Sequence, residues 1–348
     1  MKKIVFFLLI LLIINVKASN NSTIVMDIDS GRVLYQNNAY EKKLIASTTK
    51  IMTFVVAYEY AKDFLDVYVE AGEEVLKMYG TSIYISYHEK MLLRDLLYGL
   101  MLRSGNDAAE IIAYFVGGSE EKFVDLMNRK AKFIGMNNTV FNNPHGLDEV
   151  TQNYSTAYDM ALLSCYANKI DFYRQVTKTK YYKTTTENKA YSWTNRNKLL
   201  FIYPYFESGK TGYTPKAGKT LVSSAIKDGL HLTIVSLNDY NHYDTQKILY
   251  EEMFNSYKKE IILTKEQFYN KYKDLYIKKD LSYPLKKGEN VDIKVLLNDN
   301  LDYAGEVIVT LKGKEIIREK IYRNTIDNTI NNDKNILIKI KKILKKIF

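Results

Sequence analysis

One stretch of the sequence constrains the fold more than any other. Ser47 and Lys50 directly precede the largely apolar segment 51–58, which predicts a buried helix that begins near Ser47. Positions three apart lie one turn apart on the same face of a helix, so the Lys50 ammonium can reach the Ser47 hydroxyl. We therefore expect the chain to be organised around this serine and this lysine.

The pair has the chemistry of an activated nucleophile. A serine hydroxyl is a weak nucleophile until a neighbouring base takes its proton. A lysine among apolar side chains loses proton affinity, so Lys50 can serve as that base, and the helix N-terminus adds a positive dipole end. On these four residues alone we would favour another interpretation, in which Ser47 caps the helix and Lys50 lies on a solvated surface. Two later segments change the choice.

A second candidate lies between two predicted helices, 92–102 and 108–115. Ser104 and Asn106 place a hydroxyl and an amide two positions apart in the intervening turn. Such a loop can hold a second oxygen that handles protons and an amide that orients a substrate. Taken by itself, the segment favours the plainer interpretation, a turn with Asn106 or Asp107 as the N-cap of the next helix.

A third candidate lies beside a predicted hairpin. The segments 219–225 and 230–236 are predicted as strands on either side of Asp228-Gly229, which is a strong signal for two antiparallel strands and a tight turn. The preceding segment, 206–214, would then form the neighbouring edge of the sheet. An edge strand offers unpaired N–H and C=O groups on which an extended peptide can dock.

That edge strand carries Lys210, Thr211 and Gly212. The first two can bind an anion, and the glycine lets a substrate backbone approach closely. A nucleotide-binding loop is excluded for both Gly-Lys-Thr sequences in this region, because the positions that would need the first glycine hold Pro204 and Tyr213.

The net charge of +10 is unevenly distributed, which bears on possible partners. Nine of the ten excess positive charges lie in residues 1–18 and 334–348, and residues 19–333 carry a net charge of +1. We therefore expect no nucleic-acid partner. The single cysteine, Cys165, excludes an internal disulfide and a cysteine metal cluster.

The N-terminus predicts export. Residues 1–18 combine Lys2 and Lys3, an apolar run over 4–14 and a small residue, Ala18, at a cleavage site, as in a signal peptide. The alternative is an uncleaved anchor helix, but the run is short for a bilayer. Export argues against ATP and reduced nicotinamide, and we expect no cofactor.

The three motifs in this order resemble the penicillin-recognising serine hydrolases. Further segments are similar to the D-alanyl-D-alanine carboxypeptidases, the low-molecular-mass penicillin-binding proteins that trim peptidoglycan stem peptides. These segments are 45–53, 104–109, 123–128, 143–147, 197–200 and 210–215. The likeness extends from about Thr23 to the end of the chain.

The resemblance implies a mechanism. The penultimate D-alanine carbonyl of a stem pentapeptide ending in D-Ala-D-Ala would acylate Ser47, and water would then hydrolyse the acyl-enzyme. Lys50 would accept the serine proton, and Ser104 would relay a proton towards the leaving amine. β-Lactam antibiotics, which mimic the D-Ala-D-Ala end, would trap Ser47.

The resemblance also implies the groups that bind the substrate. Asn106 would hold the substrate amide, and Lys210 and Thr211 would bind its carboxylate. The backbone N–H groups of Ser47 and Tyr213 would form the oxyanion hole.

One feature departs from this pattern. Many relatives carry a carboxylate-binding arginine in the loop after the last long strand, and the corresponding segment here, 238–244, has none. The resemblance therefore leaves Lys210, or Arg196 upstream, to compensate.

Other functions fit the sequence less well. A hydrolase with a Ser-His-Asp triad is not favoured, because the chain contains no G-x-S-x-G elbow. A metal site is not expected, because the four histidines are scattered singly along the sequence. The second motif of class A β-lactamases resembles S-D-N, whereas this chain has S-G-N at 104–106, and those enzymes lack a second domain. A wall-binding protein with a decayed site remains the non-enzymatic alternative.

The expected fold is α/β (α+β): a β-lactamase/transpeptidase-like domain with an antiparallel sheet flanked by helices, then a small all-β domain. We expect a signal peptide (1–18), the catalytic domain (19–260), a small β-sandwich (261–323), and a linker with a basic helix (324–348).

The last of these segments predicts membrane attachment. Along 336–348, the apolar residues fall on one arc of a helix and the lysines on the other, with Ile338 as the exception. A basic amphipathic helix of this kind suits an anionic lipid surface, here the outer face of the cytoplasmic membrane. A helix docked on the protein's own surface would not need so many lysines.

Overall fold

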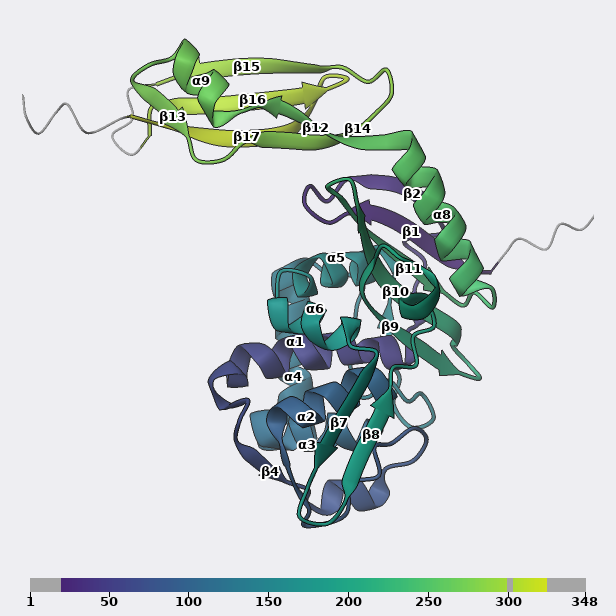
Figure 1. Cartoon of the computed structure of the whole chain (residues 1–348). Helices are drawn as coiled ribbons and strands as arrows, with labels where there is room; N and C mark the ends of the chain where they lie inside the picture. Colours follow the sequence, from purple (N-terminus) through teal and green to yellow (C-terminus); the bar gives the residue numbers. More distant parts are fainter. Residues whose placement is uncertain (1–19, 299–302, 324–348) are drawn as a thin grey trace, which may run out of the picture.

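The computed structural model describes residues 20–298 and 303–323. The expected signal peptide (1–18) and C-terminal helix (within 324–348) lie outside the described residues. Figure 1 shows a large mixed body and, above it, a small unit built mainly of strands with one short helix, α9 (Lys265–Lys271), and helix α8 (His242–Ser256) leads from one to the other.

The helical elements pack around the nucleophile segment, against the two faces of the main sheet and, for the last of them, in the small unit. They are η1 (Ala46–Thr49), α1 (Lys50–Ala61), η2 (Lys62–Phe64), η3 (Glu73–Lys77), α2 (Leu93–Tyr98), η4 (Gly99–Arg103), α3 (Asn106–Gly117), α4 (Glu120–Ile134), α5 (Ala157–Ala167), α6 (Asp171–Lys178), α7 (Leu199–Ile202), α8 and α9 (Lys265–Lys271).

The strands of the large body form one main sheet and three short ladders. They are β1 (Ser22–Asp27), β2 (Val33–Asn37), β3 (Lys43–Leu44), β4 (Tyr68–Glu70), β5 (Lys90–Leu92), β6 (Tyr154–Ser155), β7 (Tyr181–Thr185), β8 (Ala190–Thr194), β9 (Phe206–Thr214), β10 (Gly218–Lys227) and β11 (Leu230–Leu237).

The main sheet has the order β2-β1-β11-β10-β9, and every neighbouring pair is antiparallel. The predicted hairpin is confirmed: Asp228 and Gly229 have φ angles of 50° and 78°, and they join β10 to β11. Left-handed turn residues match the twist of the two strands. As expected, β9 lies at the edge of the sheet.

The sheet is packed on both faces, because neighbouring residues of a strand point to opposite sides. Leu221 and Ile234 pack with Tyr250 of α8 in one apolar cluster. Val222 and Val235 belong to the other cluster, which contains α1, α3 and α5. The expected α+β architecture, an antiparallel sheet flanked by helices, is confirmed.

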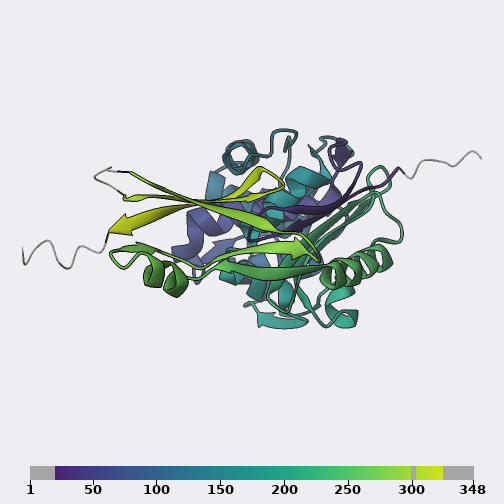
Figure 2. The same cartoon turned by 90° about the horizontal axis from the view of Figure 1, so that it is seen from above.

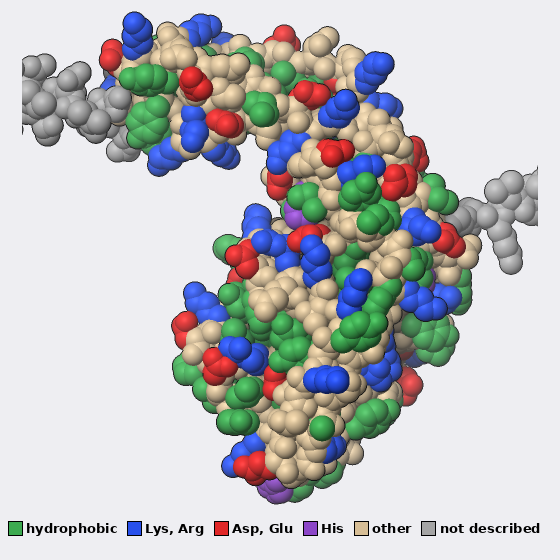
Figure 3. Space-filling view, in the orientation of Figure 1, with side chains coloured by type: hydrophobic (Ala, Val, Ile, Leu, Met, Phe, Trp, Pro, Cys, Tyr) green, Lys and Arg blue, Asp and Glu red, His purple; other side chains and the backbone are tan. Residues whose placement is uncertain are grey.

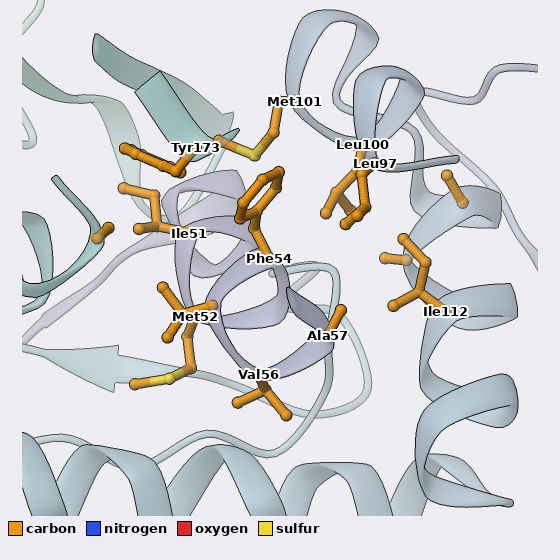
Figure 4. Packing of buried hydrophobic residues seen from close by; sticks show 14 of the residues in the cluster. Ile51, Met52, Phe54, Val56, Ala57, Leu97, Leu100, Met101, Ile112 and Tyr173 are labelled. Atoms are coloured by element: carbon orange, nitrogen blue, oxygen red, sulfur yellow. The ribbon is translucent and has the colours of Figure 1, made fainter. Parts of the chain in front are cut away.

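Helix α1 is buried on all sides, as its composition predicts. Ile51, Met52, Phe54, Val56 and Ala57 are all fully buried. Figure 4 shows their side chains pointing in different directions from one helix, into surroundings that include α2, η4 and α3. A helix that is apolar all round belongs in the interior of a protein. The first turn, η1, is 3-10 rather than α-helical.

The predicted helix over 92–102 is interrupted. Helix α2 ends at Tyr98 and the chain widens into a single π-helical turn, η4, after which Ser104 takes a left-handed conformation (φ 62°). A Cβ on Gly99 would lie 2.7 Å from Ile83, so glycine is required for this packing. Single π turns often re-aim residues at functional sites.

The small unit is built from β12 (Tyr257–Leu263), β13 (Leu275–Ile277), β14 (Leu281–Lys286), β15 (Val291–Leu297), β16 (Gly305–Leu311) and β17 (Lys314–Arg323). A four-stranded sheet, β13-β17-β16-β15, packs with the β12-β14 pair around its own apolar core. Figure 2 shows this unit from above. The unit begins at Tyr257, slightly before the expected 261, because β12 continues directly from α8 and pairs with β14.

Ion pairs join the two bodies. Arg32 binds Glu289 with two nitrogen–oxygen distances of 2.9 Å and donates to Pro284 O at 2.6 Å. Lys259 pairs with Asp29 at 2.5 Å. These contacts dock the small unit on the β1–β2 hairpin.

Acidic and basic side chains are interspersed over both bodies on the face shown in Figure 3, in line with the net charge of +1 for residues 19–333. Within the two described ranges, no helix combines the length and the apolar content that crossing a bilayer requires.

Candidate active site

Three parts of the large body converge beside Ser47. They are the η1 turn that carries it, the segment between η4 and α3, and strand β9. The close approach of β9 requires Gly212, because a Cβ there would lie 2.9 Å from Ser47 N and 3.0 Å from Thr48 N. The structure thus brings together the three segments that the sequence singled out.

Lys50 lies at the centre of this arrangement. Its Nζ atom donates to Ser47 Oγ (3.2 Å), Asn106 Oδ1 (2.7 Å) and His145 O (2.6 Å), so all three ammonium hydrogens have acceptors. The side chain is fully buried and forms no ion pair with a described carboxylate. Burial, and then the nearby charge of Lys210, hold the pKa of Lys50 well below its usual value.

Lys210 is a second buried cation. Its Nζ atom donates to Ser104 Oγ (3.0 Å) and to Thr211 O (2.6 Å). Burial, and then the charge of Arg196, lower the pKa of Lys210 to about 7. The two lysines therefore hold the hydroxyls of Ser47 and Ser104 on opposite sides of one site.

Asn106 connects the second segment to the first. Its Oδ1 atom accepts from Lys50, and its Nδ2 atom donates to Tyr79 O at 2.7 Å. The proposed cap is not formed by Asn106, since Gly105 is the N-cap residue of α3. Asp107 instead accepts from the backbone N–H groups of Ile83 and Tyr84, at 3.0 and 2.8 Å, and fixes that loop beside the site.

The sequence interpretation missed the acceptor that His145 provides to Lys50. Gly146 has φ 87°, and a Cβ there would lie 2.0 Å from Ala46 O, so glycine lets this loop lie against η1. Thr53 donates to Pro144 O at 2.5 Å and ties the same loop to α1. The Asn-Pro-His-Gly sequence signals a tight turn, but a backbone acceptor leaves no mark of its own in a sequence.

The His145 ring bonds to its own loop. Its Nδ1 atom accepts from Leu147 N at 3.0 Å. Burial, and then the charge of Lys50, lower the pKa of His145 to about 3, so the ring is neutral. His88 and His231 lie elsewhere, His242 lies at the cavity beside the two serines, and none of the three forms a hydrogen bond with Ser47.

A cavity of ≈ 430 Å³ opens beside the two serines. Its described lining includes Arg196, Lys198 and Lys219 but no acidic residue. The segment 238–244 contributes His242 and Tyr243 to the lining and no lysine or arginine. Burial, and then Arg103, lower the pKa of Arg196. A cavity of this charge suits an anionic ligand.

Thr211 and Tyr213 occupy the edge strand that borders the cavity. Tyr213 is 58% exposed, and β9 pairs with one neighbouring strand of the main sheet, β10. The backbone N–H of Ser47 lies beside Gly212, as the close approach of that glycine shows. A peptide laid along β9 would thus pass directly over the Ser47 hydroxyl.

Comparisons with known proteins agree on one family. A family model described as Peptidase S11, D-alanyl-D-alanine carboxypeptidase, matches residues 14–241. The D-alanyl-D-alanine carboxypeptidase DacF of Bacillus subtilis is 35% identical over 218 residues, which cover 62% of this chain and 56% of that protein. The corresponding DacC of Escherichia coli is 38% identical over 227 residues, covering 62% and 55%.

A solved structure extends the similarity. Penicillin binding protein 5 from Haemophilus influenzae superposes with a TM-score of 0.73 at 26% identity, covering 87% of this chain and 95% of that one. By sequence, the chain spans about half the length of the curated relatives it matches.

Proposed function

The chain belongs to the D-alanyl-D-alanine carboxypeptidase family of serine peptidases, and on that premise we propose that it removes the terminal D-alanine from peptidoglycan stem pentapeptides. One observation carries the proposal above the others. Lys50 is a fully buried amine with no carboxylate partner in the described chain, and it lies 3.2 Å from the Ser47 hydroxyl.

That environment makes Lys50 a base. Only an uncharged amine can accept a proton, and burial, which lowers the pKa of Lys50, makes this form easier to reach than for an exposed lysine. The Ser47 proton moves to Lys50 Nζ as Ser47 Oγ bonds to the penultimate D-alanine carbonyl carbon. The backbone N–H groups of Ser47 and Tyr213 are the proposed donors to the resulting oxyanion.

The tetrahedral intermediate then collapses. Its C–N bond breaks, and the leaving D-alanine amine takes a proton relayed through the Ser104 hydroxyl, which Lys210 holds at 3.0 Å. Water attacks the ester on Ser47 and releases the shortened peptide. The cyclic amide of a β-lactam would enter the same first step and remain as an ester on the serine.

The cationic cavity would select the free carboxylate of the substrate. Lys210 and Thr211 are the proposed primary contacts, and Asn106 would hold the substrate amide. Arg196 lines the cavity, whereas segment 238–244 has no arginine, so we propose that Arg196 replaces the missing group.

The proposed setting rests on the sequence alone. Segments 1–18 and 336–348 are those of an exported enzyme held at the outer face of the cytoplasmic membrane by a basic amphipathic helix.

The test combines two measurements on one protein. Intact mass is measured after incubation with benzylpenicillin, and D-alanine release is measured with a diacyl peptide ending in D-Ala-D-Ala. We expect a stable adduct and D-alanine release, both lost in Ser47→Ala and kept in Ser86→Ala, which alters an exposed serine.

Other results would identify the alternatives. An adduct that disappears quickly without peptide turnover would indicate a β-lactamase. Neither adduct nor release would contradict the proposal and favour a wall-binding protein.

A further inference from the structure

A second cluster of side chains lies behind Lys50 and takes no part in the proposed reaction. Its members are Glu110 in α3, Glu120 at the start of α4, and His145 in the loop after α4. One ligand-type atom of each lies within 4.8 Å of those of the other two. Glu110 and His145 are 2% and 8% exposed, and Glu120 is partly buried. Three separate segments thus present two carboxylates and an imidazole to one point.

The Glu110 carboxylate lacks a partner. Its Oε1 atom is buried and accepts no hydrogen bond from any described residue. No lysine or arginine among the described residues forms an ion pair with Glu110 or Glu120. A buried carboxylate oxygen without a donor costs free energy, and native structures satisfy nearly all such atoms. The cluster therefore holds a buried oxygen that a hydrogen-bond donor or a cation would satisfy.

The separation of two of these groups is informative. His145 Nε2 lies 3.4 Å from Glu110 Oε1 without forming a hydrogen bond. Two ligands about 2.1 Å from a tetrahedral zinc ion are themselves about 3.4 Å apart. The two atoms thus already have the spacing of neighbouring ligands on one ion.

We propose that Glu110, Glu120 and His145 form a site for a divalent transition-metal ion, with Zn²⁺ as the best match. One imidazole nitrogen and two carboxylate oxygens are a typical three-ligand set for zinc, and water would complete the tetrahedron. The ion would supply the positive charge that Glu110 Oε1 lacks. It would also tie α3, α4 and the loop after α4 together, independently of the proposed peptidase activity.

Binding requires a change in the His145 ring. Nδ1 accepts from Leu147 N, which leaves the proton of the neutral ring on Nε2. Zinc needs the Nε2 lone pair, so the ring proton moves to Nδ1 and the Leu147 bond breaks. The backbone oxygen of the same histidine accepts from Lys50 at 2.6 Å, so the ion would lie one residue from the proposed base.

A zinc titration of the full chain by calorimetry tests the site, with thermal unfolding as a second readout. We expect one ion per chain and a Tm that rises with zinc concentration, because a ligand of the folded state stabilises it. Glu110→Gln keeps the side-chain volume but removes a charged ligand, and we expect at least about tenfold weaker binding. Glu121→Gln changes the exposed neighbour of Glu120 and should bind zinc like the parent.

Glu120→Gln is the second variant, since a partly exposed position tolerates the change more readily than a buried one. Cobalt in place of zinc gives absorption bands that report its coordination, and we expect both Glu→Gln variants to lose them. The proposal is wrong if the parent binds no zinc at millimolar concentration, or if both variants bind it as the parent does. Neither result depends on D-alanine release, which is measured separately.

Discussion

The active site and the junction between the two bodies both bury cations, but the cation at the junction has a carboxylate partner and the cations at the active site have none among the described residues. At the junction, Arg32 has a carboxylate partner, and that pairing lowers the pKa of Glu289 to about 2. At the active site, Lys50 and Lys210 are buried against hydroxyls, an amide and backbone oxygens, and their pKa values fall. Paired charges stabilise an arrangement, whereas an unpaired buried amine is a destabilised cation that can act as a base.

Replacing the buried base gives the largest expected effect. Lys50→Met removes the proton acceptor but fills the same apolar space, so we expect acylation by benzylpenicillin to fall about 10²- to 10⁴-fold. The Tm should change little, because the loss of a buried charge is opposed by Asn106 Oδ1 and His145 O, which lose their donor. Lys62→Met changes an exposed lysine and should alter neither quantity. If Lys50→Met were acylated at the parent rate, Lys50 would not be the base, and the contrast between an unpaired amine at the active site and a paired arginine at the junction would have no catalytic meaning.

A glycine substitution tests whether the loop that faces Lys50 is held by steric fit. Gly146→Ala would place a Cβ 2.0 Å from Ala46 O, so the loop and η1 must separate. We expect about 10²-fold slower acylation, the size of effect that a displacement of about 1 Å produces. Gly135→Ala is the matched control: its φ of 92° is similarly left-handed, but nothing lies within 4 Å of its added Cβ. Equal acylation rates for both variants would contradict the steric account.

The junction should respond in stability and not in chemistry. Arg32→Ala leaves Glu289 without its bidentate partner, and we expect the small unit to be held about 1–2 kcal/mol less tightly. Limited proteolysis around β12 should become faster while acylation by benzylpenicillin stays at the parent rate. Arg318→Ala breaks two ion pairs on the surface of the small unit, with Glu306 and Glu315, and serves as the control. A loss of acylation in Arg32→Ala would show that the junction also shapes the active site.

The smallest expected effect is on pH dependence. Lys210, with a pKa of about 7, is charged below this pH and loses its proton above it, unlike an ordinary lysine. Carboxylate binding should therefore weaken as pH rises, with KM increasing by up to about tenfold per pH unit above 7. Lys210→Arg remains charged throughout this range and should give a flatter KM profile. A parent KM that is constant from pH 6 to about 9 would show that this amine does not bind the carboxylate as a cation.

Local signals predicted much of the large body. The apolar segment 51–58 forms the buried helix, Asp228-Gly229 forms the hairpin turn, and β9 lies at the sheet edge. The helix over 92–102 was only partly right, because Gly99–Arg103 form a π turn in place of continued α-helix. Strand β12 was missed, since its partner β14 follows more than a dozen residues later.

In the candidate site, too, contacts between residues close in the sequence could be predicted, and contacts between distant residues could not. Ser47 and Lys50 are three residues apart, and their contact follows from helix geometry. The remaining partners of the two lysines come from far away in the chain: Asn106 is 56 residues from Lys50, His145 is 95, and Ser104 is 106 from Lys210. The His145 cluster with Glu110 and Glu120 is also invisible in the sequence, where the histidines are scattered singly.

The sequence by itself determined the elements, the order of the three motifs and the kind of groups they carry, because these depend on residues a few positions apart. Only the tertiary structure decided which of those groups are charged. The pKa of an amine depends on what surrounds it in three dimensions. We propose that Lys50 is a base because the fold buries it away from water, beside a second lysine and without a described carboxylate in ion-pair contact, and no short pattern of residues records that environment.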